Sequence, residues 1–148
     1  MTGIRIATSD DVAAVEEVVR AAYGPWAERM GFRPLPLDAD YLSLVADGQV
    51  YVTEPVIDGV LVLSPEPGAI GVDNVAVRPG VQRRGIGGRL MAFALDHAAR
   101  SGKPSIRLYT HSAMTNNIAW YASLGFVETG REPLPVGERV HMAKDLGS

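Results

Sequence analysis

Residues 75–90, VAVRPGVQRRGIGGRL, join a strand pattern, a turn of glycines and arginines, and a helix pattern without a gap. Small apolar residues stop at Pro79, and the helical pattern expected from about Arg84 to Arg100 begins among the glycines. The first backbone N–H groups of such a helix have no partner within it and lie at the positive end of the helix dipole. We therefore expect a mixed α/β fold with an anion-binding site at this turn.

The residues of the turn fit a phosphate ligand. Glycine lets a phosphate approach the backbone, and the arginines add charge-assisted donors. The glycines could instead mark only a tight turn and the arginines a solvated face, but their position between a strand and a helix favours the phosphate. The P-loop pattern GxxxxGK[ST] is absent, and the spacing is not GxGxxG. The expected contacts are Gln82, Arg83, Arg84, Gly85, Ile86, Gly87 and Gly88.

Composition narrows the class of protein. The 148 residues suit one domain over 1–148, and 47% hydrophobic with 21% charged residues is typical of a globular protein. A net charge of −3 gives no general attraction to nucleic acid. The sequence has no cysteine, and three scattered histidines do not form a metal site. No signal-like start and no apolar run of about 20 residues is present, so we expect a cytoplasmic protein with no membrane partner.

The hydrophobic pattern predicts the element order βααβββαβαββ without repeats. The first helix is expected to begin at Thr8–Asp11, to run to Tyr23 and to end at Gly24-Pro25. The second helix is expected at Asp38–Val45 and the fourth at Asn116–Leu124. The expected strands are Ile4–Ala7, Gln49–Glu54, Gly59–Leu63, Ile70–Val77, Ser105–Thr110, Phe126–Arg131 and Val140–Lys144, with a turn at Ser64–Gly68.

The stretch 114–126, MTNNIAWYASLGF, forms an amphipathic helix when it is placed at 100° per residue. Asn117 falls inside the apolar arc and Asn116 falls outside it. Because a buried amide needs partners, Asn117 either bonds neighbouring backbone or contacts a ligand, and Tyr121 lies one turn further on the same face. We favour the ligand for Asn117, although Tyr121 taken alone fits a core aromatic.

Together these motifs resemble the GNAT superfamily of acyl-CoA-dependent N-acyltransferases. Gln82-x-x-Gly85-x-Gly87, after the strand that ends at Val77, resembles the family's pyrophosphate loop, and 114–126 resembles its second motif. The order of elements is similar along essentially the whole chain. One departure is Met114, where many relatives carry an asparagine.

The resemblance implies acetyl-CoA as the acyl donor and direct attack of an amine on its thioester, without a covalent enzyme intermediate. Val75, Ala76 and Val77 are then expected to lie beside the pantetheine, and the N–H of Val77 to hold the oxyanion. Asn117 would contact the pantetheine arm. Tyr121 would give a proton to the departing thiolate, since a phenol of pKa ~10 is protonated at neutral pH.

The attacking amine must lose a proton, and the sequence leaves the proton acceptor open. His111 and Asp73 are the preferred candidates, with Glu28, Asp40 or a chain of waters as alternatives. Each also has a structural explanation, such as a strand end for Asp73 and a turn cap for His111. Tyr23, Trp26 and Phe32, in and before the proline-rich segment, either line the acceptor pocket or cover the core.

The sequence thus predicts a single α/β domain with a twisted, mostly antiparallel sheet flanked by helices. Its expected activity is acetyl transfer from acetyl-CoA to the primary amine of a small molecule or a protein, with no metal. A non-catalytic acyl-CoA-binding regulator on the same fold and a nucleotide-binding module are the alternatives. The acceptor, the proton acceptor and the oligomeric state stay open, with a homodimer among the alternatives.

Overall fold

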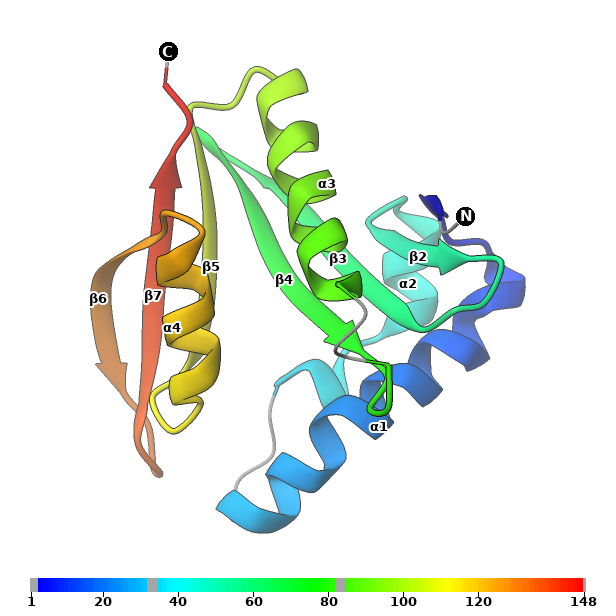
Figure 1. Ribbon diagram of the computed structural model, residues 1–148, viewed down its shortest axis with the longest axis horizontal. Helices are drawn as coiled ribbons and strands as arrows, with labels where there is room; N and C mark the ends of the chain where they lie inside the picture. Colours follow the sequence, from blue (N-terminus) through cyan, green and yellow to red (C-terminus); the bar gives the residue numbers. More distant parts are fainter. Residues whose placement is uncertain (1–2, 32–34, 82–84, 148) are drawn as a thin grey trace. The chain divides into compact units, whose positions relative to one another are not determined.

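The computed structural model describes residues 3–31, 35–81 and 85–147. The strands are β1 (Gly3–Ile6), β2 (Val50–Glu54), β3 (Gly59–Glu66), β4 (Ala69–Val77), β5 (Ser105–His111), β6 (Val127–Pro133) and β7 (Glu138–Asp145). The helices are α1 (Val12–Met30), α2 (Tyr41–Ala46), α3 (Ile86–Arg100) and α4 (Thr115–Ser123), with 3₁₀ turns η1 (Ser9–Asp11) and η2 (Leu35–Asp38). Apart from these short turns, the order of the elements is the one expected from the sequence (Figure 1).

The strands form one seven-stranded sheet in the order β1-β2-β3-β4-β5-β7-β6. The pairs β1–β2, β2–β3, β5–β7 and β6–β7 are antiparallel, and β4–β5 is parallel. This confirms the predicted mixed α/β class with a mostly antiparallel sheet. The chain divides into two compact units, of which the first comprises Met1–Leu63 and Asp73–Ala94 and the second Ser64–Val72 and Leu95–Ser148. A single domain over 1–148 stays a prediction.

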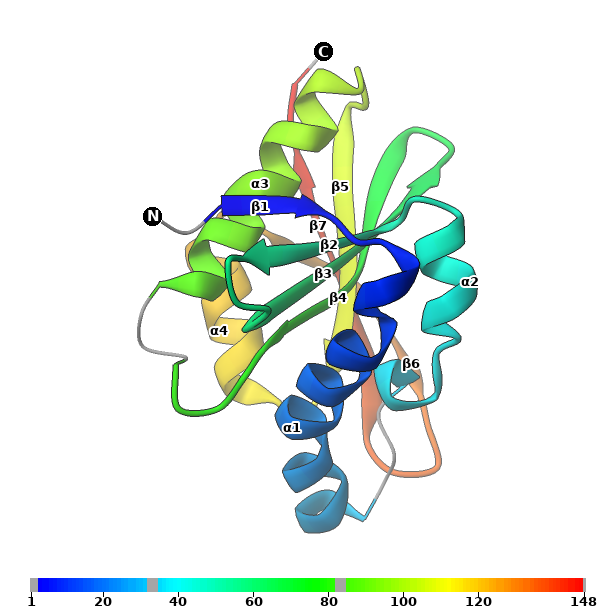
Figure 2. The same cartoon turned by 90° about the vertical axis from the view of Figure 1, so that its right-hand side faces the viewer.

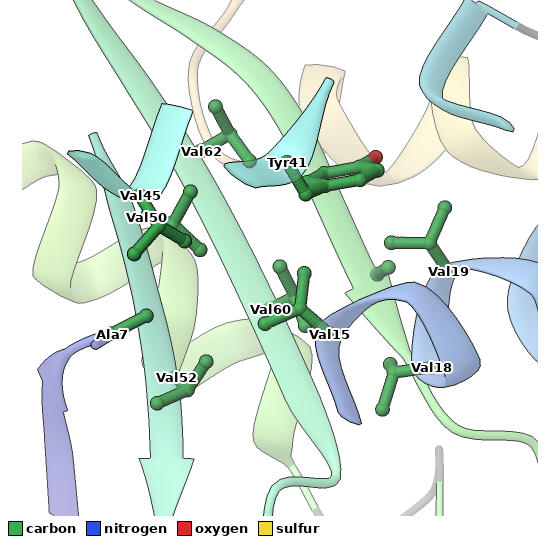
Figure 3. Close-up of a cluster of buried hydrophobic side chains, with 11 residues drawn as sticks. Ala7, Val15, Val18, Val19, Tyr41, Val45, Val50, Val52, Val60 and Val62 are labelled. Atoms are coloured by element: carbon green, nitrogen blue, oxygen red, sulfur yellow. The ribbon is translucent and has the colours of Figure 1, made fainter. Parts of the chain in front are cut away.

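A valine-rich cluster holds the first unit together. In this unit β1, β2, β3 and the second half of β4 run side by side (Figure 2). Alternate residues of β2 and β3 point to one face of the sheet, where the apolar side of α1 and part of α2 cover them (Figure 3). Burying one valine side chain contributes about 1.5–3 kcal/mol, so these contacts fix α1 on the sheet. The cluster consists of Ala7, Val15, Val18, Val19, Tyr41, Val45, Val50, Val52, Val60, Val62 and Ala76.

The predicted end of the first helix at Gly24-Pro25 is wrong, because α1 continues through both residues to Met30. The fixed φ of proline is compatible with a helix, although Pro25 gives up one backbone hydrogen bond. Interactions on both sides of the proline support the continuation. Tyr23, just before it, packs against the valine-rich cluster, and after it the guanidinium of Arg29 lies 4.9 Å from the centre of the Trp26 ring. The helix ends at Gly31, whose φ of 71° is left-handed and whose N–H donates to Ala27.

The turn expected at Ser64–Gly68 is shorter than predicted, because β3 runs on to Glu66 and only Pro67 and Gly68 turn. Two basic residues of the second unit support this extension of β3. The ammonium of Lys103 donates to the carbonyl oxygen of Glu66 at 3.0 Å, and Arg107 forms an ion pair with the Glu66 carboxylate. The hairpin formed by β3 and β4 is therefore longer than the sequence predicts.

The second unit is built on β5, β7 and β6, with α4 beside the strands (Figure 1). β7 begins two residues before the predicted Val140, and its residues 139–145 pair with the whole of β5, from Ser105 opposite Asp145 to His111 opposite Arg139. β6, at the edge of the sheet, is exposed along almost all of its length. None of the helices in the described ranges is long and apolar enough to cross a membrane.

Candidate active site

The second half of β4, in the first unit, is the strand predicted to lie beside pantetheine. Ala76 is 1% exposed and belongs to the valine-rich cluster, whereas Val75 and Val77 are half-buried and point to the other face of the sheet. The ladder between β4 and β5 extends from Ala69 to Val72, so residues 75–77 lie beyond its last pair. Val75 and Val77 are thus placed on the sheet face opposite to the one that α1 covers.

The glycine turn ends where the sequence places the anion site. Gly85 has a φ of 75°, and α3 begins at the next residue. The N–H of Arg89 donates to the carbonyl of Gly85 at 3.1 Å, so the N–H groups of residues 86–88 precede the first helical hydrogen bond. Among the residues that the structure describes, a Cβ at Gly85 or Gly88 would meet nothing within 4 Å, which is compatible with a ligand beside this backbone. Gln82, Arg83 and Arg84 lie outside the described residues.

Gly59, at the start of β3, sets how closely α3 approaches the sheet. A Cβ at this position would lie 2.8 Å from Cγ2 of Ile86 and 3.0 Å from Cδ1 of Leu90. These distances are below an ordinary carbon–carbon contact of about 3.5–4.0 Å. The first turn of α3 therefore rests directly on the bare backbone of β3, and the ring of Phe93, two turns on, contacts Tyr51 at 4.9 Å between ring centres.

Tyr121 lies in α4 of the second unit and is 7% exposed. Its ring packs at 5.1 Å from Trp120 and edge-on at 6.0 Å from Phe126, measured between ring centres. Burial raises the pKa of the Tyr121 hydroxyl to about 12, because the phenolate would lose its hydration. The hydroxyl is thus protonated throughout the neutral range.

Asn117 and Asn116 have the burial that the helical phase predicts. Asn116 is exposed, whereas Asn117 is half-buried and donates from Nδ2 to the sulfur of Met114 at 3.6 Å. The same sulfur accepts from the Thr110 hydroxyl at 3.7 Å. Met114 therefore joins the end of β5 to the first turn of α4.

His111 uses both ring nitrogens within the second unit. Nδ1 accepts from the N–H of Ala113 at 3.0 Å, so the ring proton sits on Nε2, which donates to the carbonyl of Val136 at 2.6 Å. Gly137 makes this contact possible, since a Cβ there would come within 2.5 Å of the imidazole. His111 thus ties the end of β5 to the β6–β7 turn, and a proton could reach Nδ1 only after the Ala113 N–H had left it.

The other candidate proton acceptors lie in the first unit. Asp73 is half-buried in β4 and shares a sheet face with Val75. Asp40 is the N-cap of α2, where its carboxylate accepts from the N–H of Ser43 at 3.2 Å and from the Ser43 hydroxyl at 2.9 Å. These hydrogen bonds lower the pKa of Asp40. Glu28 is exposed on α1.

The residues expected to line the acceptor pocket have different environments. The hydroxyl of Tyr23 donates to Oδ1 of Asn74 at 2.8 Å and lies 3.3 Å from the carbonyl oxygen of Val75. Trp26 is half-buried beneath Arg29, and Phe32 lies outside the described residues. The structure thus brings Tyr23 to β4, next to a strand residue predicted to contact the acyl donor.

Sequence reasoning missed Asn74 and its partner Tyr41. Asn74 is 5% exposed, and its Nδ2 donates to the hydroxyl of Tyr41 at 3.0 Å. The sequence did carry a signal for Asn74. It is an amide in the otherwise apolar run NVAV at the end of a predicted strand, and a polar side chain buried there needs hydrogen-bond partners.

In the described ranges, no three His, Cys, Asp or Glu side chains are grouped so that they could hold a metal ion.

Comparisons with known proteins define the class of the chain. A family model described as an acetyltransferase (GNAT) domain matches residues 44–128. The [ribosomal protein bS18]-alanine N-acetyltransferase of Salmonella typhimurium is 29% identical over 132 residues, which are 86% of this chain and 82% of that protein. Mycothiol acetyltransferase of Mycobacterium leprae is 28% identical over 144 residues, which are 94% of this chain but 42% of that protein. The chain thus spans less than half of the latter.

Solved structures show the same fold. PaiA N-acetyltransferase from Thermoplasma acidophilum, in complex with coenzyme A, superimposes with a TM-score of 0.82 at 16% identity over 98% of this chain and 99% of that one. The ribosomal-protein-S18-alanine N-acetyltransferase of Escherichia coli gives a TM-score of 0.79 at 18% identity over 100% and 96%.

The fold and the family match define an acyl-CoA-dependent transferase. The chain belongs to the GNAT acetyltransferase family, and its reaction is N-acetyl transfer from acetyl-CoA. The family, the reaction class and the acyl donor predicted from the sequence are therefore confirmed.

Proposed function

We propose that the acceptor is the N-terminal α-amine of a protein. The observation that carries this proposal is the similarity to the bS18-alanine N-acetyltransferase, since it extends over 82% of that protein. The chemistry of the candidate site agrees with it. An α-amine has a pKa of about 7.7–8.0 against about 10.4 for a lysine side chain, so roughly a tenth is neutral at pH 7. Such an acceptor needs little help from a base, and both nitrogens of His111 are already engaged.

The test is acetyl-CoA turnover with a panel of amines, followed by thiol detection of released CoA. A hexapeptide that begins with alanine should give the highest kcat/KM. Two other acceptors are compared with it. One is the same peptide with an acetylated N-terminus and an internal lysine, and the other is phenethylamine, a small-molecule amine. A higher kcat/KM for the lysine peptide or for phenethylamine would contradict the α-amine assignment.

We assign the pyrophosphate of CoA to residues 82–88 and the pantetheine to Val75, Ala76, Val77 and Asn117. The N–H groups that precede the first bond of α3 and the open space at Gly85 and Gly88 support the first assignment. Gly87→Asp would place bulk and negative charge beside these groups. Calorimetry should then show at least tenfold weaker CoA binding, and unchanged affinity in a folded variant would contradict the assignment.

Tyr121 is proposed to assist the departure of the CoA thiolate. The amine nitrogen forms a bond to the acetyl carbon, the carbon–sulfur bond breaks, and the sulfur leaves as a thiolate of pKa ~8.5. Full transfer of the proton from a hydroxyl whose pKa is about 12 would be uphill by roughly 5 kcal/mol. Tyr121 therefore acts mainly as a hydrogen-bond donor to the developing charge and gives up its proton late.

For the proton of the amine, we propose Asp73 in preference to His111. Asp73 shares its sheet face with Val75, whereas Nδ1 of His111 accepts a backbone N–H. The distinguishing measurement is kcat as a function of pH, because kcat/KM would also follow the protonation of the free α-amine, whose pKa is about 7.7–8.0. Asp73→Asn should lose the acidic limb of the wild-type profile, and His111→Asn should keep it. The reverse result would make His111 the proton acceptor.

A further inference from the structure

A chain of hydrogen bonds crosses the first unit from β4 to the segment between α1 and α2. Tyr23 donates to Asn74, Asn74 donates to Tyr41, and the hydroxyl of Tyr41 donates to the carbonyl oxygen of Pro36 at 2.6 Å. Asn74 is 5% and Tyr41 3% exposed, and the ring of Tyr41 belongs to the valine-rich cluster (Figure 3). The chain thus combines two tyrosines and one amide in an otherwise apolar interior.

The carbonyl oxygen of Pro36, the last group in this series of hydrogen bonds, determines which group donates in each of the other bonds. A carbonyl oxygen can only accept, so the hydrogen of Tyr41 points to Pro36 and its oxygen accepts from Asn74. Asn74 must then present Nδ2 to Tyr41 and Oδ1 to Tyr23, which fixes the orientation of its amide. The loss of either tyrosine hydroxyl leaves Asn74 with an unpaired buried atom, and the effect passes to the other end.

One end of this series of hydrogen bonds lies beside β4, which the proposed function assigns to the pantetheine, and the other end lies in the proline-rich segment, which the sequence predicts to line the acceptor pocket. Asn74 immediately precedes Val75, assigned to the pantetheine, and the Tyr23 hydroxyl lies 3.3 Å from the Val75 carbonyl oxygen. Pro36 lies in η2, in the proline-rich segment expected to line the acceptor pocket. We propose that Asn74, with Tyr23 and Tyr41, is a positioning device that couples the acyl-donor strand to the acceptor segment. This inference rests on the proposed contact of β4 with the pantetheine and on the predicted acceptor role of the proline-rich segment.

Two conservative variants each remove one hydroxyl from this series of hydrogen bonds and keep the aromatic ring. Tyr23→Phe removes the donor next to β4, and Tyr41→Phe removes the donor to Pro36. Tyr51→Phe is the matched control, because it deletes a hydroxyl in the same unit on the sheet face that contacts α3. Amide hydrogen exchange measures the coupling between the two segments without requiring a catalysed reaction. Tyr41→Phe should speed exchange at residues 74–77 at least threefold, Tyr23→Phe should do the same at residues 37–44, and Tyr51→Phe should do neither.

Kinetics supply the second readout. With acetyl-CoA and the alanine hexapeptide, Tyr41→Phe should raise the acceptor KM about fivefold, and Tyr23→Phe should lower kcat about tenfold. The double variant should lose no more kcat/KM than the worse single variant, because the chain acts as a unit. Enzyme concentrations are corrected for the fraction of the protein that binds CoA, so that a loss of folded protein is not mistaken for a change in kcat.

Faster exchange only at the mutated end, or losses in kcat/KM that simply multiply, would overturn the coupling. Absence of wild-type turnover with every amine would instead contradict the proposed function, while the exchange measurement would still decide the coupling.

Discussion

Gly59→Ala tests whether the packing of α3 on β3 places the anion site. The added Cβ would lie 2.8 Å from Cγ2 of Ile86, and an ordinary contact needs about 3.5 Å, so we expect the first turn of α3, which carries Ile86, to retreat by up to roughly 0.7 Å. A charge-assisted hydrogen bond of about 2.8 Å to a phosphate would then lengthen to about 3.5 Å, the limit of such a bond. Losing one bond of this kind costs about 1.5–3 kcal/mol, which corresponds to at least a tenfold rise in Kd for CoA.

The assay is calorimetric titration of CoA, with thermal unfolding measured on the same samples. Overpacking of this kind also costs about 1–3 kcal/mol of stability, so Tm should fall as well. Gly130→Ala is the matched control, since a Cβ there meets nothing within 4 Å and the residue lies in the second unit. A lower Tm with unchanged Kd for CoA would refute the view that Gly59 sets the position of the anion site.

Three further predictions concern individual side chains. Gly24→Ala should leave the free energy of unfolding within about 1 kcal/mol of wild type in chemical denaturation, because the higher helix propensity of alanine is opposed by contact of its Cβ with the ring of Pro25, the next residue in α1. The buried Tyr121 hydroxyl, with a pKa of about 12 against 10 when unfolded, gives stability that is complete below pH 10 and lost as pH rises to 12. Denaturation of Tyr121→Phe over this range should therefore show a smaller alkaline loss than wild type, and equal losses would contradict the shift. Asn117→Ala should raise the KM for acetyl-CoA, whereas Asn116→Ala should not, and equal effects would show that the exposed residue also contacts the donor.

Local patterns were enough to predict much of the fold. The order of the elements followed from strand alternation and helical spacing, since both periodicities are visible within ten residues. The glycine turn predicted the start of α3 to within two residues, at about Arg84 instead of Ile86, and the different burial of Asn116 and Asn117 followed from helical phase alone.

The features that the sequence did not predict depend on contacts between distant residues. Pro25 was expected to end a helix because its local cost is visible, whereas packing of the preceding turn on the valine-rich cluster is not. The extension of β3 to Glu66 depends on Lys103, 37 positions later. The turn cap offered for His111 agrees with its Nδ1 accepting from Ala113, whereas its contact with Val136, 25 positions later, could not be foreseen.

The ion pairs of β6 have a consequence for how the protein behaves at high concentration. Its exposed edge has backbone groups that could recruit a strand from another molecule, the usual route to edge-to-edge aggregation. Arg131 bonds Glu128 at 2.6 Å and Glu138 at 3.3 Å, and Glu132 pairs with Arg139 at 3.1 Å. An incoming strand would have to displace these charged groups and remove them from water, and Pro133 closes the end of the strand. The last hairpin thus carries its own protection against polymerisation, which replacement of Glu128 and Arg131 by threonine would weaken.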